Sequence, residues 1–300
     1  MWVNLVQGLV VGLLIGGVYA LVSLGLTLIY GVLKVVNFAH GEFLMIAMYA
    51  TYWLWALLGL DPILSAVLTM PLLYVGGVYF YKVIIKPLLK PPDPARARFI
   101  PDPHLSQIFM TLGLSVVMQN VVLFLWRADY RSVVTSYSVS TIRAGPILIS
   151  FPKLLAFIAC MVLMVLFMIF MLKTDTGKAI RATTQNTEVA QLMGINVQRM
   201  FGMAFGIGMA FLAAAGAFIV PFLYVFPTVG FHFALMAFII VVLGGYGSIR
   251  GAVLGGLIIG ISESMGVQIF VANAQFFLPF LIFILVLLFR PEGLFGGGRL

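Results

Sequence analysis

The sequence predicts an all-α, polytopic membrane protein with about 8–10 transmembrane or re-entrant helices. Of its 300 residues, 63% are hydrophobic and 9% are charged, whereas a soluble domain carries about 25% charged residues. The run from Leu154 to Leu172 contains no charge and is close to the roughly 20 apolar residues that cross a bilayer. It also lacks the alternation of polar and apolar residues that marks a membrane β-strand. We therefore expect one transmembrane domain, residues 1–300.

The apolar blocks give the expected spans in chain order. No basic residue precedes the first block, so we expect a permanent span from Asn4 onward and not a cleaved signal peptide. Spans are expected near residues 5–30, 42–59, 63–84, 105–126, 154–172 and 201–226. Shorter or interrupted spans are expected near residues 232–245, 251–268 and 276–290.

Lysine and arginine residues concentrate in two loops, residues 85–104 and 173–200. Two spans separate these loops, so both face one side, which the positive-inside rule identifies as cytoplasmic. Arg290 and Arg299 place the C-terminus on the cytoplasmic side as well. With an odd number of crossings, nine, the N-terminus would lie outside. Prolines between residues 87 and 103 predict a semi-rigid connector. The net charge of +8 lies in short loops, so it indicates topology and not binding to nucleic acid.

Few residues could support catalysis or bind a cofactor. The one cysteine, Cys160, lies within an apolar run, which excludes a disulfide or a Cys-x-x-Cys metal site within the chain. A G-x-x-x-x-G-K-[ST] phosphate loop is absent, and no nucleophile–base set is recognisable. His104 and His232 are isolated, and we interpret both as structural. We therefore expect no metal, no cofactor and no enzymatic activity.

The polar stretch from Thr174 to Asn196 is the most informative feature, because it lies between apolar runs and must sit in water. A first short helix is expected to begin at Asp175 or Thr176, which can cap it, and to run through Ala182. Lys178 and Arg181 stand three residues apart on that helix.

A second short helix is expected after a cap at Asn186 or Thr187. Glu188 would lie in its first turn, where the helix dipole favours an anion, and Gly194 suits its C-terminal end. We expect the two helices to form a compact projection on the cytoplasmic face, with a solvated connector as the alternative. The small residues of this stretch favour close packing: Gly177, Ala179, Ala182, Ala190 and Gly194.

The motif N-F-A-H-G-E-F, residues 37–43, places Asn37, His40 and Glu42 at the edge of an apolar block. A carboxylate at the bilayer centre costs about 2.5–3.5 kcal/mol, so we expect it to line a wet path or to pair with a neighbour. Gly41 would permit a break in the helix. The hypothesis is a discontinuous helix beside the permeation path, and the alternative is an ordinary interfacial turn.

A glycine-rich motif, G-G-Y-G-S-I-R-G, follows at residues 244–251. Glycine inside a helix costs about 1 kcal/mol relative to alanine, so this density indicates a break or tight helix packing. Both readings remain open: packing alone, or a hinge that moves during transport. The residues concerned are Gly244, Gly245, Gly247, Ser248 and Gly251. Glu263, which is flanked by serines, is expected to end a span at the outer interface, with a path-lining role as the alternative.

Motifs in this chain resemble those of the branched-chain amino acid permease family of ATP-binding-cassette importers. E-V-A-x-x-x-G at residues 188–194 is similar to the E-A-A-x-x-x-G loop of such importers, although Val189 replaces the middle alanine and the downstream I-x-L-P is absent. G-K-A-I-R-A at residues 177–182, N-F-A-H-G-E-F, and V-L-G-G-Y-G-S-I-R-G-A-V-L-G-G at residues 242–256 resemble signatures of this family. The resemblance covers most of the chain and is closest to the shorter type of permease subunit.

The resemblance implies a multi-pass subunit of a bacterial or archaeal plasma (inner) membrane. Such a subunit pairs with a second, related permease; two ATPase subunits dock on its cytoplasmic loops, and a periplasmic or extracellular substrate-binding protein delivers the cargo. It also implies an ATPase-coupling role for Gly177, Lys178, Arg181, Ala182, Asn186, Glu188, Ala190 and Gly194. A place on the translocation path, or at a helix break, is the corresponding expectation for Asn37, His40, Gly41, Glu42, Gly244, Gly245, Gly247, Ser248 and Gly251.

The expected function is import of leucine, isoleucine and valine by alternating access. One alternative keeps the fold and changes the cargo to urea, short amides or other amino acids. A second is a secondary transporter driven by an ion gradient, which would need paired intramembrane charges; Glu42 and Glu263 are the candidates, and neither has an evident partner in the sequence. A membrane-embedded enzyme is the third.

Overall fold

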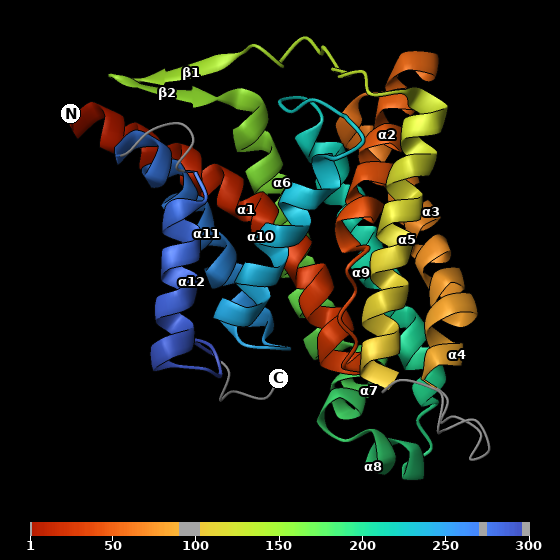
Figure 1. Ribbon diagram of the computed structural model, residues 1–300. Coiled ribbons are helices and arrows are strands. Elements are labelled where there is room, and N and C mark those ends of the chain that lie inside the picture. The colour runs from red at the N-terminus through yellow and green to blue at the C-terminus, as the bar shows by residue number, and fades with distance from the viewer. Residues whose placement is uncertain (1, 90–102, 270–274, 296–300) are drawn as a thin grey trace.

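The computed structural model describes residues 2–89, 103–269 and 275–295, and helices make up most of them (Figure 1). The N-terminal half contains α1 (Trp2–Leu33), α2 (His40–Leu58), α3 (Pro62–Phe80), a π-helical turn (Tyr81–Ile85), α4 (Lys86–Leu88) and α5 (Pro103–Trp126). Strands β1 (Thr141–Ala144) and β2 (Ile147–Ser150) follow. The remaining helices are α6 (Phe151–Lys173), α7 (Asp175–Gln185), α8 (Thr187–Leu192), α9 (Val197–Ile219), α10 (Val229–Gly244), α11 (Ile249–Ile269) and α12 (Phe277–Phe289).

The all-α membrane fold is confirmed. Among the described residues, seven helices are long and apolar enough to cross a bilayer: α1, α2, the continuous stretch Pro62–Leu88, α5, α6, α9 and α11. The apolar helices α10 and α12 are shorter, as the sequence indicated for the C-terminal third. The expected boundary at residue 226 was wrong, because α9 ends at Ile219. Beyond Ile219 the chain is no longer helical, and Val225 exchanges backbone hydrogen bonds of 2.7 and 2.9 Å with Arg131.

Helices α1 and α9 form the centre of the bundle. Within α9, 89% of the most apolar window is buried, against 11% for α5 at the periphery. Helix α1 packs along α11 and also against α9, while α3 covers another face of α9. With 32 residues, α1 is about 48 Å long at 1.5 Å per residue. It is therefore longer than the hydrocarbon core, and it leans across the bundle (Figure 1).

The molecule has two distinct ends. Helices α7 and α8 project from one end, which we call the α7–α8 side (Figure 1). The two antiparallel strands and the start of α1 lie at the other end, the hairpin side, where Thr141 pairs with Ser150 and Ala144 with Ile147. The loop expected to begin at residue 85 starts later, because the π-helical turn and α4 extend the helix to Leu88. Most of the proline-rich connector, residues 90–102, lies outside the described residues.

Candidate functional site

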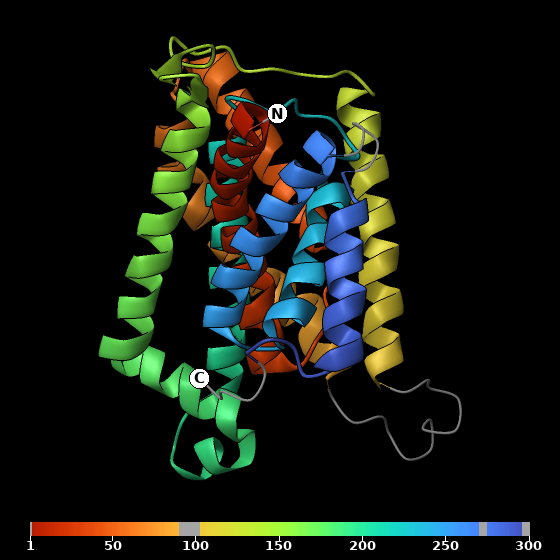
Figure 2. The ribbon, with the colours of Figure 1, turned by 90° about the vertical axis from the view of Figure 1, so that its left-hand side faces the viewer.

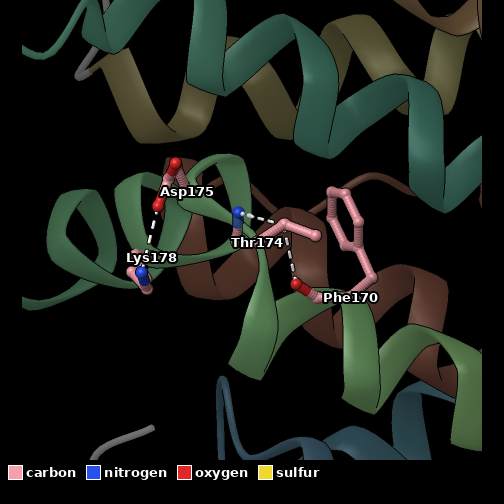
Figure 3. A network of polar contacts seen from close by, with 5 residues as sticks. Phe170, Thr174, Asp175 and Lys178 are labelled. Atoms are coloured by element: carbon pink, nitrogen blue, oxygen red, sulfur yellow. Dashed lines mark hydrogen bonds and ion pairs between the residues drawn. The ribbon is translucent and has the colours of Figure 1, made fainter.

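The α7–α8 segment, residues 174–196, consists of two short capped helices, as the sequence predicted. The cap of α7 is Thr174 and not Asp175 or Thr176: its Oγ1 accepts from the Gly177 amide at 3.0 Å and donates to the Phe170 carbonyl at 2.8 Å (Figure 3). Thr174 has the extended backbone required of a cap. Helix α7 also continues past Ala182 to Gln185.

The cap of α8 is Asn186, whose Oδ1 accepts from the amides of Glu188 and Val189, both at 3.0 Å. Gly194 follows the helix with φ +82°, the left-handed conformation expected of glycine after a helix end. The Ile195 amide then donates to the Ala190 carbonyl at 3.0 Å. The local sequence therefore fixes both ends of this helix.

Apolar side chains are exposed at the tip of this segment. Leu192 is 86% and Met193 78% exposed, and Val189 beside them is also open to solvent. A groove of about 420 Å³ adjoins α8, lined in part by Thr187, Gln191 and Phe201. Exposed apolar clusters outside the membrane mark surfaces that contact another protein.

The inner face of α7 attaches the segment to the bundle. Ile180 and Thr183 are buried, and Gly177 lies directly against the backbone of Phe170 and Met171. The charged positions face outward: Lys178 is exposed and pairs with Asp175 at 3.0 Å (Figure 3). Arg181 and Ala182 are half-buried at the flank of the helix.

The first half of the N-F-A-H-G-E motif, Asn37 to Ala39, completes a non-helical connection between α1 and α2, and His40 to Glu42 form the start of α2. Residues 34–39 leave helical geometry after Leu33, and Lys34 takes φ +58°. The buried Asn37 accepts from the Ala39 amide at 3.1 Å, and the His40 Nε2–H donates to the Val22 carbonyl at 3.0 Å. Non-helical backbone at membrane depth requires burial in protein or contact with a cavity, and these hydrogen bonds meet that requirement.

The break in the chain lies before Gly41 and not at it, so that part of the expectation was wrong. Gly41 sits in the first turn of α2 with its backbone against Gly230 of α10. A side chain at either position would overlap the other backbone. The role of Gly41 is thus close helix contact, because a hydrogen atom is the only substituent that fits.

Glu42 has partners that the sequence did not reveal. Its side chain is 2% exposed, and Oε1 accepts from Ser115 at 3.1 Å and from Gln119 at 3.4 Å, both on α5. Oε2 has no hydrogen-bond partner among the described residues. Burying a carboxylate in the membrane with an acceptor oxygen that has no hydrogen-bond partner costs free energy, and ionisable residues at such positions are usually functional.

The glycine-rich motif forms the turn between α10 and α11. Gly245 and Gly247 take φ +91° and +81°, and the Ser248 Oγ accepts from the Gly251 amide at 3.1 Å. Gly244 and Gly251 pack backbone to backbone across the turn. The motif therefore provides both a turn that only glycine adopts easily and a close helix contact.

Helix α7 and the glycine-rich turn meet near the end of α1. A Cβ atom at Gly31 would lie 3.2 Å from Gly247 and 3.8 Å from Thr184 of α7. The rings of Tyr30 and Tyr246 lie 4.4 Å apart. Helix α7 and the glycine-rich turn thus both pack near the end of α1, three residues before the 34–39 connection begins.

A polar cluster toward the hairpin side was missed in the sequence, and it corrects two interpretations. His232 is not isolated, because its Nε2 lies 2.7 Å from the Tyr19 hydroxyl and 3.7 Å from Glu263. Glu263 does not end a span; it lies within α11 and accepts from the Tyr19 hydroxyl at 2.6 Å. Up to 244 residues separate these partners, so local sequence carried no signal of their contact. No group of three metal-ligating side chains occurs in the described part of the chain.

The comparisons with known proteins agree with this architecture. Residues 8–287 match the family described as "Branched-chain amino acid transport system / permease component". The chain is 32% identical to the high-affinity branched-chain amino acid transport permease BraD of Pseudomonas aeruginosa, covering 97% of this chain and 95% of that protein. It is 31% identical to LivH of Escherichia coli, a permease of the same description, and the match covers 95% of this chain and 93% of that protein. No solved structure gives a significant match. This chain belongs to the branched-chain amino acid permease family.

Proposed function

We propose that this chain is the membrane-embedded subunit of an ATP-driven importer that moves leucine, isoleucine and valine into the cell by alternating access. Its relatives are named as high-affinity branched-chain amino acid transport permeases, and its apolar helices fit a multi-pass protein of the inner membrane. ATP hydrolysis is the work of partner subunits, because the chain carries no phosphate-binding loop.

The proposed complex contains a second, related permease, two ATPase subunits and an external substrate-binding protein. The exposed apolar tip of α8 carries this proposal, since Leu192 and Met193 lie outside the membrane-spanning helices and remain uncovered by the chain itself. We assign this tip and the adjoining groove as the ATPase docking surface. The α7–α8 side is then cytoplasmic, and residues 173–200 form the coupling loop.

Docking at α8 would reach the translocation path through the contact around Gly31. Movement of α7 would shift Thr184, which faces Gly31, and Gly31 in turn faces Gly247 of the α10–α11 turn. The 34–39 connection begins three residues later and leads to Glu42. We propose that this connection and the glycine-rich turn form the movable part of the path, where non-helical backbone bends more readily than a continuous helix.

Copurification tests the docking surface. Leu192→Glu combined with Met193→Glu should abolish recovery of the ATPase subunits with the tagged chain in mild detergent, because charge at the tip opposes burial. Val139→Glu is the matched control: Val139 is 85% exposed, and its loop lies on the hairpin side. Glu188→Arg with Gly194→Trp is a second variant of the same surface. Equal recovery of ATPase in every variant would refute the assignment.

Uptake tests the path. We expect Glu42→Gln to lower ATP-dependent leucine uptake about tenfold, because a hydrogen bond to a charged group contributes about 1.5–3 kcal/mol. Glu292→Gln, at an exposed position near the C-terminus, is the control and should leave uptake unchanged. Normal uptake by Glu42→Gln, with normal assembly, would exclude a functional role for this carboxylate.

An ion-gradient-driven transporter is the second candidate, and one observation favours it. His232 and Glu263 lie 3.7 Å apart and are linked through the Tyr19 hydroxyl, an arrangement of the kind used in proton relays. Uptake by the purified chain alone in vesicles, driven by a proton gradient without ATP, would establish this alternative in place of the importer.

A further inference from the structure

A cavity of about 380 Å³ lies toward the hairpin side, between α1, α6, the connection that follows α9, α10 and α11. Its volume falls near the lower end of the range of about 300–1,000 Å³ for small-molecule sites. Charged or titratable side chains reach it from several helices: Tyr19, Lys153, His232 and Glu263. Ionisable residues are rare at membrane depth and usually mark a path or a ligand site.

Glu263 forms an acidic pole in this cavity. The Tyr19 hydroxyl has one proton and donates it to Glu263 Oε2 at 2.6 Å. The contact of 2.7 Å between Tyr19 and His232 therefore requires the histidine Nε2 to donate to the tyrosine oxygen. Tyr19 holds the carboxylate and is itself held by His232, while Oε1 keeps capacity to accept from a ligand, since His232 Nε2 lies 3.7 Å from it, beyond hydrogen-bond distance.

Lys153 forms a basic pole on a different helix. It stands at the start of α6, and its ammonium lies 5.9 Å from the centre of the Phe222 ring. Among the described residues it forms no ion pair, so its charge is free to meet an anion. Helix α6 lies to one side of α1 and α11 to the other (Figure 2), and both pack against α1.

Aliphatic and aromatic side chains form the rest of the wall. Ile15, Val18, Ile219 and Leu223 contribute branched aliphatic groups, and Phe222 and Phe233 contribute aromatic rings. A ligand that matches all three features carries one ammonium, one carboxylate and a small apolar side chain.

We propose that this cavity binds a free α-amino acid with a branched aliphatic side chain, with its ammonium at Glu263 and its carboxylate at Lys153. The inference deepens the proposed function by naming the residues that contact cargo. Urea and short amides lack both charges and leave Glu263 and Lys153 unmatched. We expect the affinity of this site to be low, because a site on a transport path must also release its cargo.

Cysteine protection tests the proposal directly. Cys160→Ala removes the one cysteine of the chain, and Leu223→Cys then places a single thiol on the cavity wall. Tyr224→Cys is the matched control, since Tyr224 is the next residue, is exposed and does not line the cavity. The full chain, with its copurifying subunits in nanodiscs, is treated with a maleimide, with or without millimolar leucine.

Leucine should slow modification of Leu223→Cys severalfold and leave Tyr224→Cys unaffected. Glu263→Gln should remove the protection by leucine but keep that by isocaproate, which lacks the ammonium. Lys153→Met should remove the protection by leucine but keep that by isoamylamine, which lacks the carboxylate. A structural role for either residue would not separate the two analogues in this way.

Absence of protection by leucine, or equal protection in wild type and both charge variants, would overturn the proposal. ATP-dependent leucine uptake by the wild-type complex is measured in parallel. Normal uptake without cavity protection rejects the cavity and keeps the importer. Protection without ATP-dependent uptake keeps the amino acid site and rejects the importer.

Discussion

The α7–α8 segment and the cavity that contains Glu263 and Lys153 differ in how they are built. The segment is continuous in sequence, and its caps at Thr174 and Asn186 bond to amides within three residues. The cavity is assembled from α1, α6, α10 and α11, and its central contact joins residues 244 positions apart. The segment depends on local geometry, whereas the cavity depends on how closely distant helices approach.

This difference separates two kinds of vulnerability. A change at the exposed face of the α7–α8 segment alters one projection and leaves the bundle intact, because the segment meets the bundle through the buried face of α7 and a smaller contact of α8 with α9. A change at the helix contacts beneath the cavity disturbs the whole membrane domain.

Gly260→Leu should have the largest effect. Gly260 of α11 lies against the backbone of Gly16 of α1, and three residues further along these helices stand Glu263 and Tyr19. A leucine cannot be accommodated by moving a side chain, so we expect a loss of about 3 kcal/mol of stability and of leucine protection in the cavity. Gly113→Leu, where a Cβ meets nothing within 4 Å, is the control. Thermal unfolding in detergent measures the stability of both variants, and equal melting temperatures for Gly260→Leu and Gly113→Leu would contradict the prediction.

Gly194→Val should affect the α7–α8 segment alone. A non-glycine residue at φ +82° costs about 1–2 kcal/mol, so the end of α8 should fray and the ATPase subunits should copurify less well. Gly145→Val carries the same kind of strain at φ +63° in the strand turn of the opposite side. If both variants lose ATPase equally, the loss reflects general instability and not docking.

Asp175→Asn should have the smallest effect. Its ion pair with Lys178 is on the surface, with the aspartate side chain 99% exposed, and such pairs contribute less than about 1 kcal/mol. Stability and ATPase recovery should both match the wild type. A clear loss of ATPase with unchanged stability would instead show that this carboxylate contacts the partner.

The sequence predicted the membrane fold, most helix boundaries and the two short helices of the α7–α8 segment. These features follow from hydropathy and capping residues, which act over a few positions. The errors lie where distant helices meet. Gly41 was assigned to a helix break, whereas Gly230 determines its environment. Glu42 was given no partner, although Ser115 and Gln119 contact it from α5.

By itself, the sequence determined that this chain spans a membrane and presents a capped polar segment between its spans. A run of apolar residues must form a helix in lipid, and Thr174, Asn186 and Gly194 fix local backbone geometry wherever the bundle places them. The tertiary structure was needed to see that Tyr19 bridges His232 and Glu263, that Lys153 lines the same cavity, and that Gly31 faces both Thr184 and Gly247. The packing of α1 against helices far along the chain sets these contacts, because close approach depends on which small residues face one another.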